Sequence, residues 1–178
     1  MHRKGKAWRQ GGSRGLPRAF VGVALALLVL VPACGGSGGR AGTPPAPGTS
    51  SEPEETAFAP ALKVDLSAMR RTPSGLYVQD IKVGTGAVAR RTSTVSVRYT
   101  GYLANGTILD TTGSGEPATF RLGGREVIPG WDEGIPGMKV GGIRRLVVRP
   151  ELAYGERGTA GVPPGATLVF DIQLVNVR

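Results

Sequence analysis

The sequence predicts one folded domain of the α+β class, with an antiparallel sheet of about five strands and a single short helix. Two observations support this class. Short apolar segments that alternate with period two, as half-buried strands do, recur from residue 76 to the C-terminus with turn residues between them. The one helical candidate, Trp131–Gly134, has room for two turns at most before Pro136-Gly137 ends it.

Five segments of the sequence have the pattern of strands. In the clearest of them, Thr94–Thr100, Val95, Val97 and Tyr99 fall on one face. The last segment shows the same alternation over a greater length. The five expected strands are Leu76–Val83, Thr94–Thr100, Thr119–Leu122, Ile143–Val148 and Thr167–Val177.

The connections carry recognisable turn signals. Asn105-Gly106 between apolar segments predicts a hairpin turn, which we prefer to a glycosylation site at the same residues. Gly84–Ala89 matches a glycine-rich dinucleotide loop, but no helical pattern follows it, so we expect a turn. Lys63–Arg71 has a weak helical pattern, and Pro150–Gly165 is expected to be a long loop.

Composition excludes several kinds of chemistry. The only histidine is His2 and the only cysteine is Cys34, so the expected domain cannot hold a Ser-His-Asp or Cys-His site, a His/Cys zinc site or an internal disulfide. An all-carboxylate metal site stays possible, but no calcium-loop spacing is present, so we expect no metal. We also expect no cofactor.

The net charge of +9 comes mostly from the N-terminus. Six basic residues lie in the first 18, and the remainder carries 16 basic and 13 acidic residues. This is ordinary solubility charge, so we expect no nucleic-acid binding. The pairs Arg90-Arg91 and Arg144-Arg145 are interpreted as solvated faces.

The N-terminus has the organisation of a signal peptide. The basic first 18 residues precede Ala19–Val31, an apolar run too short to cross a bilayer, which needs about 20 residues. Val31-Pro32-Ala33-Cys34 follows and resembles a bacterial lipobox, which would make Cys34 the site of lipid attachment. A conventionally cleaved secreted protein and an uncleaved anchor with a free thiol are the alternatives.

These features divide the chain into three parts. Residues 1–33 are the expected signal peptide, 34–61 a lipidated cysteine and flexible linker rich in Gly, Pro, Ser and Thr, and 62–178 the folded domain. A coil of this composition would span roughly 30 Å, and an extended one roughly 80 Å. We therefore expect a lipoprotein of the cell envelope, membrane-anchored and facing the extracytoplasmic side.

Trp131 follows Pro129-Gly130 and has two possible roles. A single tryptophan in such a domain is commonly a core residue. It can also form the floor of an apolar binding pocket, since such pockets are mostly apolar with a few placed polar groups. The residues around it in the sequence leave both roles open.

Six motifs between Gly75 and Val177 resemble those of FKBP-type peptidyl-prolyl cis-trans isomerases. They occur in that family's order and near its spacing. The motifs are Val97-Arg98-Tyr99-Thr100-Gly101, Gly106-x-x-Leu109-Asp110, Val127-Ile128-Pro129-Gly130-Trp131, Gly137-Met138-x-x-Gly141, Ala153-Tyr154-Gly155 and Pro163-Pro164-x-Ala166-Thr167-Leu168-x-Phe170-Asp171.

The resemblance implies a sheet wrapped around the short helix, with a ligand pocket between them. It implies that Asp110, Tyr154 and Trp131 are the catalytic residues, with Trp131 under the prolyl ring. It also implies that the Ile128 backbone N–H bonds a substrate carbonyl. The implied substrate-binding residues are Tyr99, Leu109, Phe120, Val127, Ile128, Trp131, Tyr154, Val162 and Phe170.

Two positions depart from the family pattern. Leu109 stands where phenylalanine usually precedes the aspartate, and Ala118 stands where phenylalanine often follows the proline of the next loop. The loop from Tyr154 to Pro163 is also about one residue short. These departures bear on substrate preference and on drug affinity.

The expected function is peptidyl-prolyl cis-trans isomerisation in extracytoplasmic protein folding, without covalent chemistry. The expected partners are proline-containing polypeptides and FK506-type macrolides, and we expect a monomer. One alternative is a chaperone (holdase) module that binds proline-bearing segments without useful turnover. A purely structural envelope lipoprotein is a third possibility, but it would give the pocket residues no role.

Overall fold

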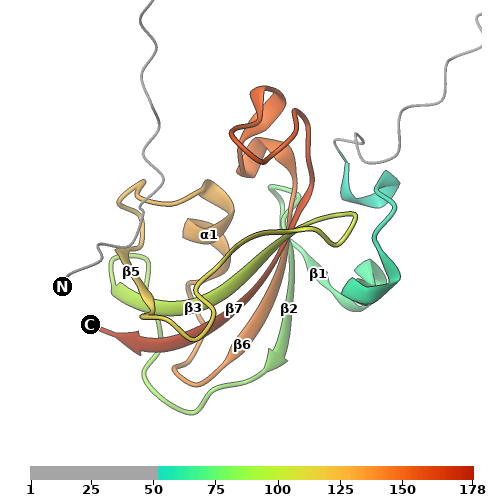
Figure 1. The fold of residues 1–178 in the computed structure, drawn as a ribbon. Helices are drawn as coiled ribbons and strands as arrows, with labels where there is room; N and C mark the ends of the chain where they lie inside the picture. Colours follow the sequence, from blue (N-terminus) through green and yellow to red (C-terminus); the bar gives the residue numbers. More distant parts are fainter. Residues whose placement is uncertain (1–51) are drawn as a thin grey trace, which may run out of the picture. The chain divides into compact units, whose positions relative to one another are not determined.

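The computed structural model describes residues 52–178, and Figure 1 shows their fold. The predictions for residues 1–51 lie outside the described residues. These are the signal peptide, the lipid on Cys34 and most of the linker. Among the described residues, no helix is both long and apolar enough to span a bilayer.

The domain is built on one antiparallel sheet. Its strands run in the order β1-β2-β6-β7-β3-β4, and β5 also pairs with β3. The expected α+β class with an antiparallel sheet and one short helix is confirmed. The strands are β1 Arg70–Arg71, β2 Tyr77–Lys82, β3 Thr94–Leu103, β4 Ile108–Thr111, β5 Ala118–Arg121, β6 Ile143–Val148 and β7 Leu168–Val177.

Strand β3 pairs with three other strands. One edge pairs with β7 from Val95↔Val177 to Leu103↔Leu168. The other edge is shared: the first half of β3 pairs with β5 and the second half with β4. The turn between β3 and β4 is the expected hairpin, closed by bonds from the Gly106 and Leu103 amides. Strand β4 itself was not expected.

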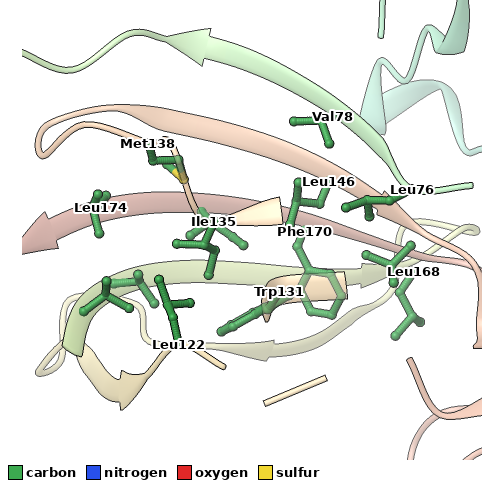
Figure 2. Packing of buried hydrophobic residues seen from close by; sticks show 14 of the residues in the cluster. Leu76, Val78, Leu122, Trp131, Ile135, Met138, Leu146, Leu168, Phe170 and Leu174 are labelled. Carbon is green, nitrogen blue, oxygen red and sulfur yellow. The ribbon is translucent and has the colours of Figure 1, made fainter. Parts of the chain in front are cut away.

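The inner face of the sheet holds the main core. Alternate residues of β7, from Leu168 to Leu174, face inward and are buried. They pack with Val95 and Val97 of β3 and with Trp131 and Ile135 from the α1 segment (Figure 2). The period-two alternation of apolar residues along these strands is therefore the cause of this inward-facing core.

The helix α1, Pro129–Gly134, lies on that inner face. Pro129 suits the first helical turn, where its missing N–H removes no bond. Two glycines bring the helix close to the sheet. A Cβ at Gly130 would lie 2.6 Å from Val148 Cγ1, and one at Gly134 would lie 2.7 Å from Leu146 Cδ1. Only glycine therefore allows this separation of helix and sheet.

The segment Glu52–Met69, which we call the N-terminal strap, packs on part of the outer face of the sheet. Its turns are the 3₁₀ helices η1 Pro53–Glu55, η2 Pro60–Leu62 and η3 Leu66–Ala68. A second apolar cluster joins it to the outer face of β2, β6 and β7. The buried members of this cluster are Leu62, Met69, Tyr77, Val147 and Val169.

The strap corrects two expectations. Residues 52–61 were expected to be linker, but they fold onto the domain. The helix suggested by Lys63–Arg71 is wrong, since the segment forms one 3₁₀ turn and then strand β1, which pairs with β2. Isolated helices this short are marginal in water, so tertiary pairing decides the conformation.

The long loop between β6 and β7 contains two short 3₁₀ helices, η4 Pro150–Leu152 and η5 Gly155–Arg157. Bonds between Thr159 and Val162 in both directions, and from the Gly165 amide to the Gly155 carbonyl, close it on itself. It was expected as a loop without such elements. The Gly84–Ala89 segment is irregular, with a bend at Gly86 and an isolated bridge from Val88 to Lys139, and no helix follows it. Gly84 packs directly on the backbone of residues 139–142.

Candidate active site around Trp131

Trp131 lies at the centre of an aromatic cluster. Its side chain is buried, and three rings from three different strands surround it. Tyr99 and Phe170 meet it edge-on, with ring centroids 4.8 and 5.3 Å away and interplanar angles of 78° and 87°. Phe120 lies 5.7 Å away at 38°. Edge-to-face pairs of this kind add to the stabilisation from burial alone.

Three polar contacts hold the helix that carries Trp131. The Asp132 carboxylate accepts a bond of 2.8 Å from the Gly123 amide. Both oxygens of Glu133 lie 2.8 Å from the Ser74 hydroxyl. Arg144 donates to the Gly134 carbonyl at 2.7 Å and so caps the C-terminus of α1. The tryptophan is therefore set on a short but fixed helix.

Arg144 was expected on a solvated face, and this expectation is wrong. Its side chain is only 9% exposed and forms a two-bond pair with Asp80, at 2.6 and 3.0 Å. The signal was present in the sequence, because Arg144 shares the inward face of its strand with Leu146 and Val148. A buried guanidinium needs such partners, and here they fix α1 against β2 and β6.

A polar edge lies beside the aromatic cluster. The Tyr99 hydroxyl donates to Asp110 Oδ2 at 2.5 Å, and the Thr111 amide donates to Asp110 Oδ1 at 2.8 Å. Burial is the main cause that raises the pKa of Tyr99, and the bond to Asp110 raises this pKa further. Burial is likewise the main cause that raises the pKa of Tyr154, and the negative charge of Asp110 raises it further. Both phenols are therefore protonated at neutral pH, as hydrogen-bond donors must be.

Two N–H groups in this region are unusual. Trp131 Nε1 is buried and has no hydrogen-bond partner within residues 52–178. The Ile128 amide, directly before α1, donates to no other described residue. The first N–H groups of a helix have no partner within it, so they are open to an outside acceptor.

The structure brings all the predicted substrate-binding residues into one cluster. Phe120, Trp131, Val162 and Phe170 are buried members. The others are partly buried and pack against them, and Ala118 joins them from β5. The partly buried residues are Tyr99, Leu109, Val127, Ile128 and Tyr154. Their individual roles as floor, walls and rim remain predictions.

Two hollows lie near the site residues. A small hollow of about 50 Å³ lies between β2 and the residues after α1, beside Asp80 and Arg144. A larger and more open hollow lies on the outer face near Arg98 and Gln173. Within residues 52–178, no three His, Cys, Asp or Glu side chains are grouped to hold a metal ion.

Comparison with known proteins places these features in a family. The sequence model described as FKBP-type peptidyl-prolyl cis-trans isomerase matches residues 86–175. FK506-binding protein 4 of Neurospora crassa is 47% identical over 104 residues, which are 58% of this chain and 22% of the fungal protein. The chain thus matches only about a fifth of the length of that relative.

Two solved structures are similar in both fold and sequence. FkpA from Escherichia coli superposes with a TM-score of 0.58 at 44% identity, over 62% of this chain and 52% of FkpA. The structure titled AtFKBP13 gives 0.58 at 40% identity, over 62% of this chain and 98% of its own. With half of its residues matched by the family model, the chain belongs to the FKBP-type peptidyl-prolyl cis-trans isomerase family.

Proposed function

We propose that this protein is an active peptidyl-prolyl cis-trans isomerase that binds proline-containing segments against Trp131. The observation that carries the proposal is the arrangement of Tyr99, Phe120 and Phe170 around the indole, with the Tyr99–Asp110 bond at its edge. A prolyl ring fits an apolar aromatic surface, and a few placed polar groups orient the chain on either side of it.

The reaction requires no bond to be broken. Rotation about the peptide bond faces a barrier of roughly 18–20 kcal/mol because the amide loses resonance when it twists. A site that binds the twisted amide better than the planar one lowers this barrier. An acceleration on the order of 10⁶ requires about 8 kcal/mol of such differential binding.

Each described group has a place in this mechanism. The aromatic surface around Trp131 holds the prolyl ring away from water. The Ile128 amide, which has no acceptor among the described residues, would donate to a substrate carbonyl. Tyr154 and Asp110 lie at the polar edge and would orient the chain without transferring a proton. The two raised tyrosine pKa values are consistent with this role.

The decisive experiment is a proline-isomerisation assay on a series of short peptides that differ in the residue before proline. We expect catalysed interconversion that an FK506-type macrolide inhibits. Binding of the same peptides without acceleration would support the alternative, a holdase for proline-bearing segments. Neither binding nor acceleration would refute both.

We also propose that the protein is a lipoprotein anchored through Cys34, with its domain on the extracytoplasmic side of the membrane. The support is the basic start, the apolar run Ala19–Val31 and the cysteine that follows. Mass spectrometry of membrane-extracted protein should show a chain that begins at Cys34 and carries lipid mass. A chain that retains Met1, or a soluble product with an unmodified thiol, would contradict the anchor.

A further inference from the structure

The loop between β6 and β7 carries two of the residues that the proposed function places at the site. Tyr154 and Val162 both pack against the cluster that contains Trp131. Within the loop, reciprocal bonds of 3.0 and 2.9 Å join Thr159 and Val162. These local bonds give the loop its shape. Its position over the site must be fixed where it leaves and rejoins the sheet.

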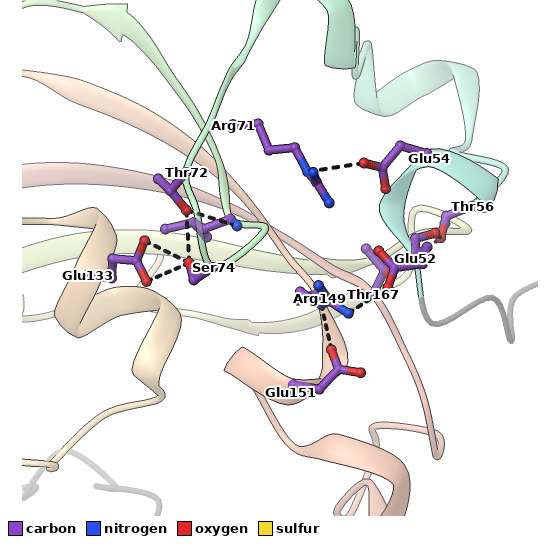
Figure 3. A network of polar contacts seen from close by, with 11 residues as sticks. Glu52, Glu54, Thr56, Arg71, Thr72, Ser74, Glu133, Arg149, Glu151 and Thr167 are labelled. Carbon is purple, nitrogen blue, oxygen red and sulfur yellow. Dashed lines mark hydrogen bonds and ion pairs between the residues drawn. The ribbon is translucent and has the colours of Figure 1, made fainter.

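Both ends of this loop are held by the N-terminal strap. At the first end, Arg149 Nη2 donates to Glu52 Oε1 at 2.5 Å. At the second end, the Thr56 hydroxyl lies 3.3 Å from that of Thr167 and also donates to the Glu52 carbonyl at 2.9 Å. A single turn of the strap, η1, therefore connects the two ends, as Figure 3 shows.

Arg149 is the central residue of this connection. Its Nε donates to Glu151 Oε2 at 2.7 Å, in the first turn of η4 and therefore inside the loop. Its side chain also packs over Gly75, where a Cβ would lie 2.8 Å from Nη1. Because the guanidinium is planar and contacts three elements at once, it transmits the position of the strap to the start of the loop.

The strap is in turn fixed to the outer face of the sheet. The Ala59 amide donates to the Ala104 carbonyl at 2.8 Å, and Arg145 Nη1 donates to the Leu62 carbonyl at 2.6 Å. Further along η1, Glu54 accepts a bond of 2.5 Å from the Tyr77 hydroxyl and pairs with Arg71 at 3.2 Å. Glu54 therefore holds the strap to the sheet; it forms no hydrogen bond to the loop, and only its charge acts on Arg149.

We infer that Glu52 and Arg149 are positioning residues, which set Tyr154 and Val162 over the site through the ends of their loop. This rests on the proposed function. Their side chains are 39% and 22% exposed, and ion pairs so close to solvent contribute little to global stability. Their contribution is to hold the loop in one place. The strap lies outside residues 86–175, which the family model matches. Its contacts to the loop are therefore made from outside the matched region.

The matched variants are Glu52→Gln and Glu54→Gln, each measured in the full chain. Both remove a carboxylate from the same turn of the strap, but only Glu52 is hydrogen-bonded to Arg149 at the end of the loop. We expect Glu52→Gln to raise KM about three- to tenfold with kcat nearly unchanged, a size typical of coupled neighbours. Glu54→Gln removes only a through-space attraction to Arg149, so it should change KM much less than Glu52→Gln does. It should lower Tm at least as much as Glu52→Gln, because it loses contacts to Tyr77 and Arg71.

Hydrogen exchange gives a readout that does not depend on activity. In Glu52→Gln, the amides of Thr159, Val162 and Gly165 should exchange faster, while those of β3 and β7 should not change. A Tyr154→Ala background should remove most of the effect of Glu52→Gln on KM, since the coupling acts through that loop. Arg149→Lys keeps the charge but not the planar fork, so it should behave like Glu52→Gln.

Two results would overturn the inference. One is equal changes in KM and in loop exchange for the Glu52 and Glu54 variants, which would indicate a general loosening of the strap. The other is unchanged loop exchange in Glu52→Gln. An inactive wild type would refute the proposed function, but the exchange comparison would still test the positioning of the loop.

Discussion

The Tyr99 hydroxyl and the Asp110 carboxylate form a bond of 2.5 Å between neighbouring strands, β3 and β4. Removing this donor in Tyr99→Phe keeps the ring that packs on Trp131 but leaves Asp110 oriented only by its neighbour's amide. We expect kcat/KM to fall several-fold and the free energy of unfolding to fall by only about 1 kcal/mol. Peptide assays and thermal unfolding measure the two. Unchanged turnover would show that the bond between Tyr99 and Asp110 plays no part in catalysis.

Turnover should be nearly independent of pH between about 6 and 9. The pKa values of Tyr99 and Tyr154 are raised above their usual value of about 10, so both phenols stay protonated in this range. Because the folded-state pKa is the higher one, their contribution to stability is complete below pH 10. It is lost as pH rises toward the folded values. A bell-shaped rate profile with a group titrating near neutrality would instead indicate acid–base catalysis.

Trp131→Phe should be tolerated better than its burial suggests. The indole N–H has no partner among the described residues, so the substitution breaks no hydrogen bond there. Trp131→Ala, in contrast, should cost roughly 3–5 kcal/mol of stability, as large-to-small core changes do. Denaturant unfolding compares the two. Equal losses would show that the indole nitrogen makes a contribution that its surroundings do not explain.

Gly130→Ala should destabilise the protein, although alanine ordinarily favours helices over glycine. The added methyl would lie 2.6 Å from Cγ1 of Val148, a stiff and fully buried side chain. Overpacking of this kind typically costs 1–3 kcal/mol, which exceeds the propensity gain of roughly 0.5–1 kcal/mol. Fluorescence of Trp131 should also shift as α1 moves. A more stable variant would mean that helix and sheet separate easily.

Ala118→Phe tests the wall on which this chain departs from its family pattern. Ala118 and Phe120 point to the same side of β5, and Phe120 lies against Trp131. A new ring there should improve affinity for an FK506-type ligand by roughly 1 kcal/mol or more and favour large apolar residues before proline. Titration and the peptide series measure these effects. Unchanged affinity and ranking would show that this wall does not contact ligand.

Period-two alternation in the sequence was sufficient to locate most of the sheet and its inner face. It could not locate β4, a short strand at the edge of the sheet with no buried residue. Such a strand is defined by its pairing with β3 and not by its own pattern. Alternation placed Tyr99 and Phe170 on the inner face of the sheet, but only the resemblance of their motifs to the FKBP-type family predicted that they and Trp131 belong to a site.

The strap was missed because its composition is that of a linker. Pro53 and Pro60 begin its turns, but local sequence gives no reason for those turns to be ordered. Order comes from residues far away in the chain, such as Tyr77 and Arg149. Arg149 gave no sequence signal for the same reason, since its partners are separated from one another by nearly the whole domain.

The pairing of β3 with β7 bears on when the domain can fold during its synthesis. Strand β7 is the last strand of the domain, and β4, β5, α1 and β6 lie between it and β3 in the sequence; the pairing begins at Val95↔Val177. Contacts of this range close slowly, because the chain between them must be ordered first. A nascent chain that lacks its last residues has no partner for that edge of β3. We therefore expect the sheet to close only after synthesis of β7 is complete, so that the chain leaves the ribosome before its longest strand pairing has formed.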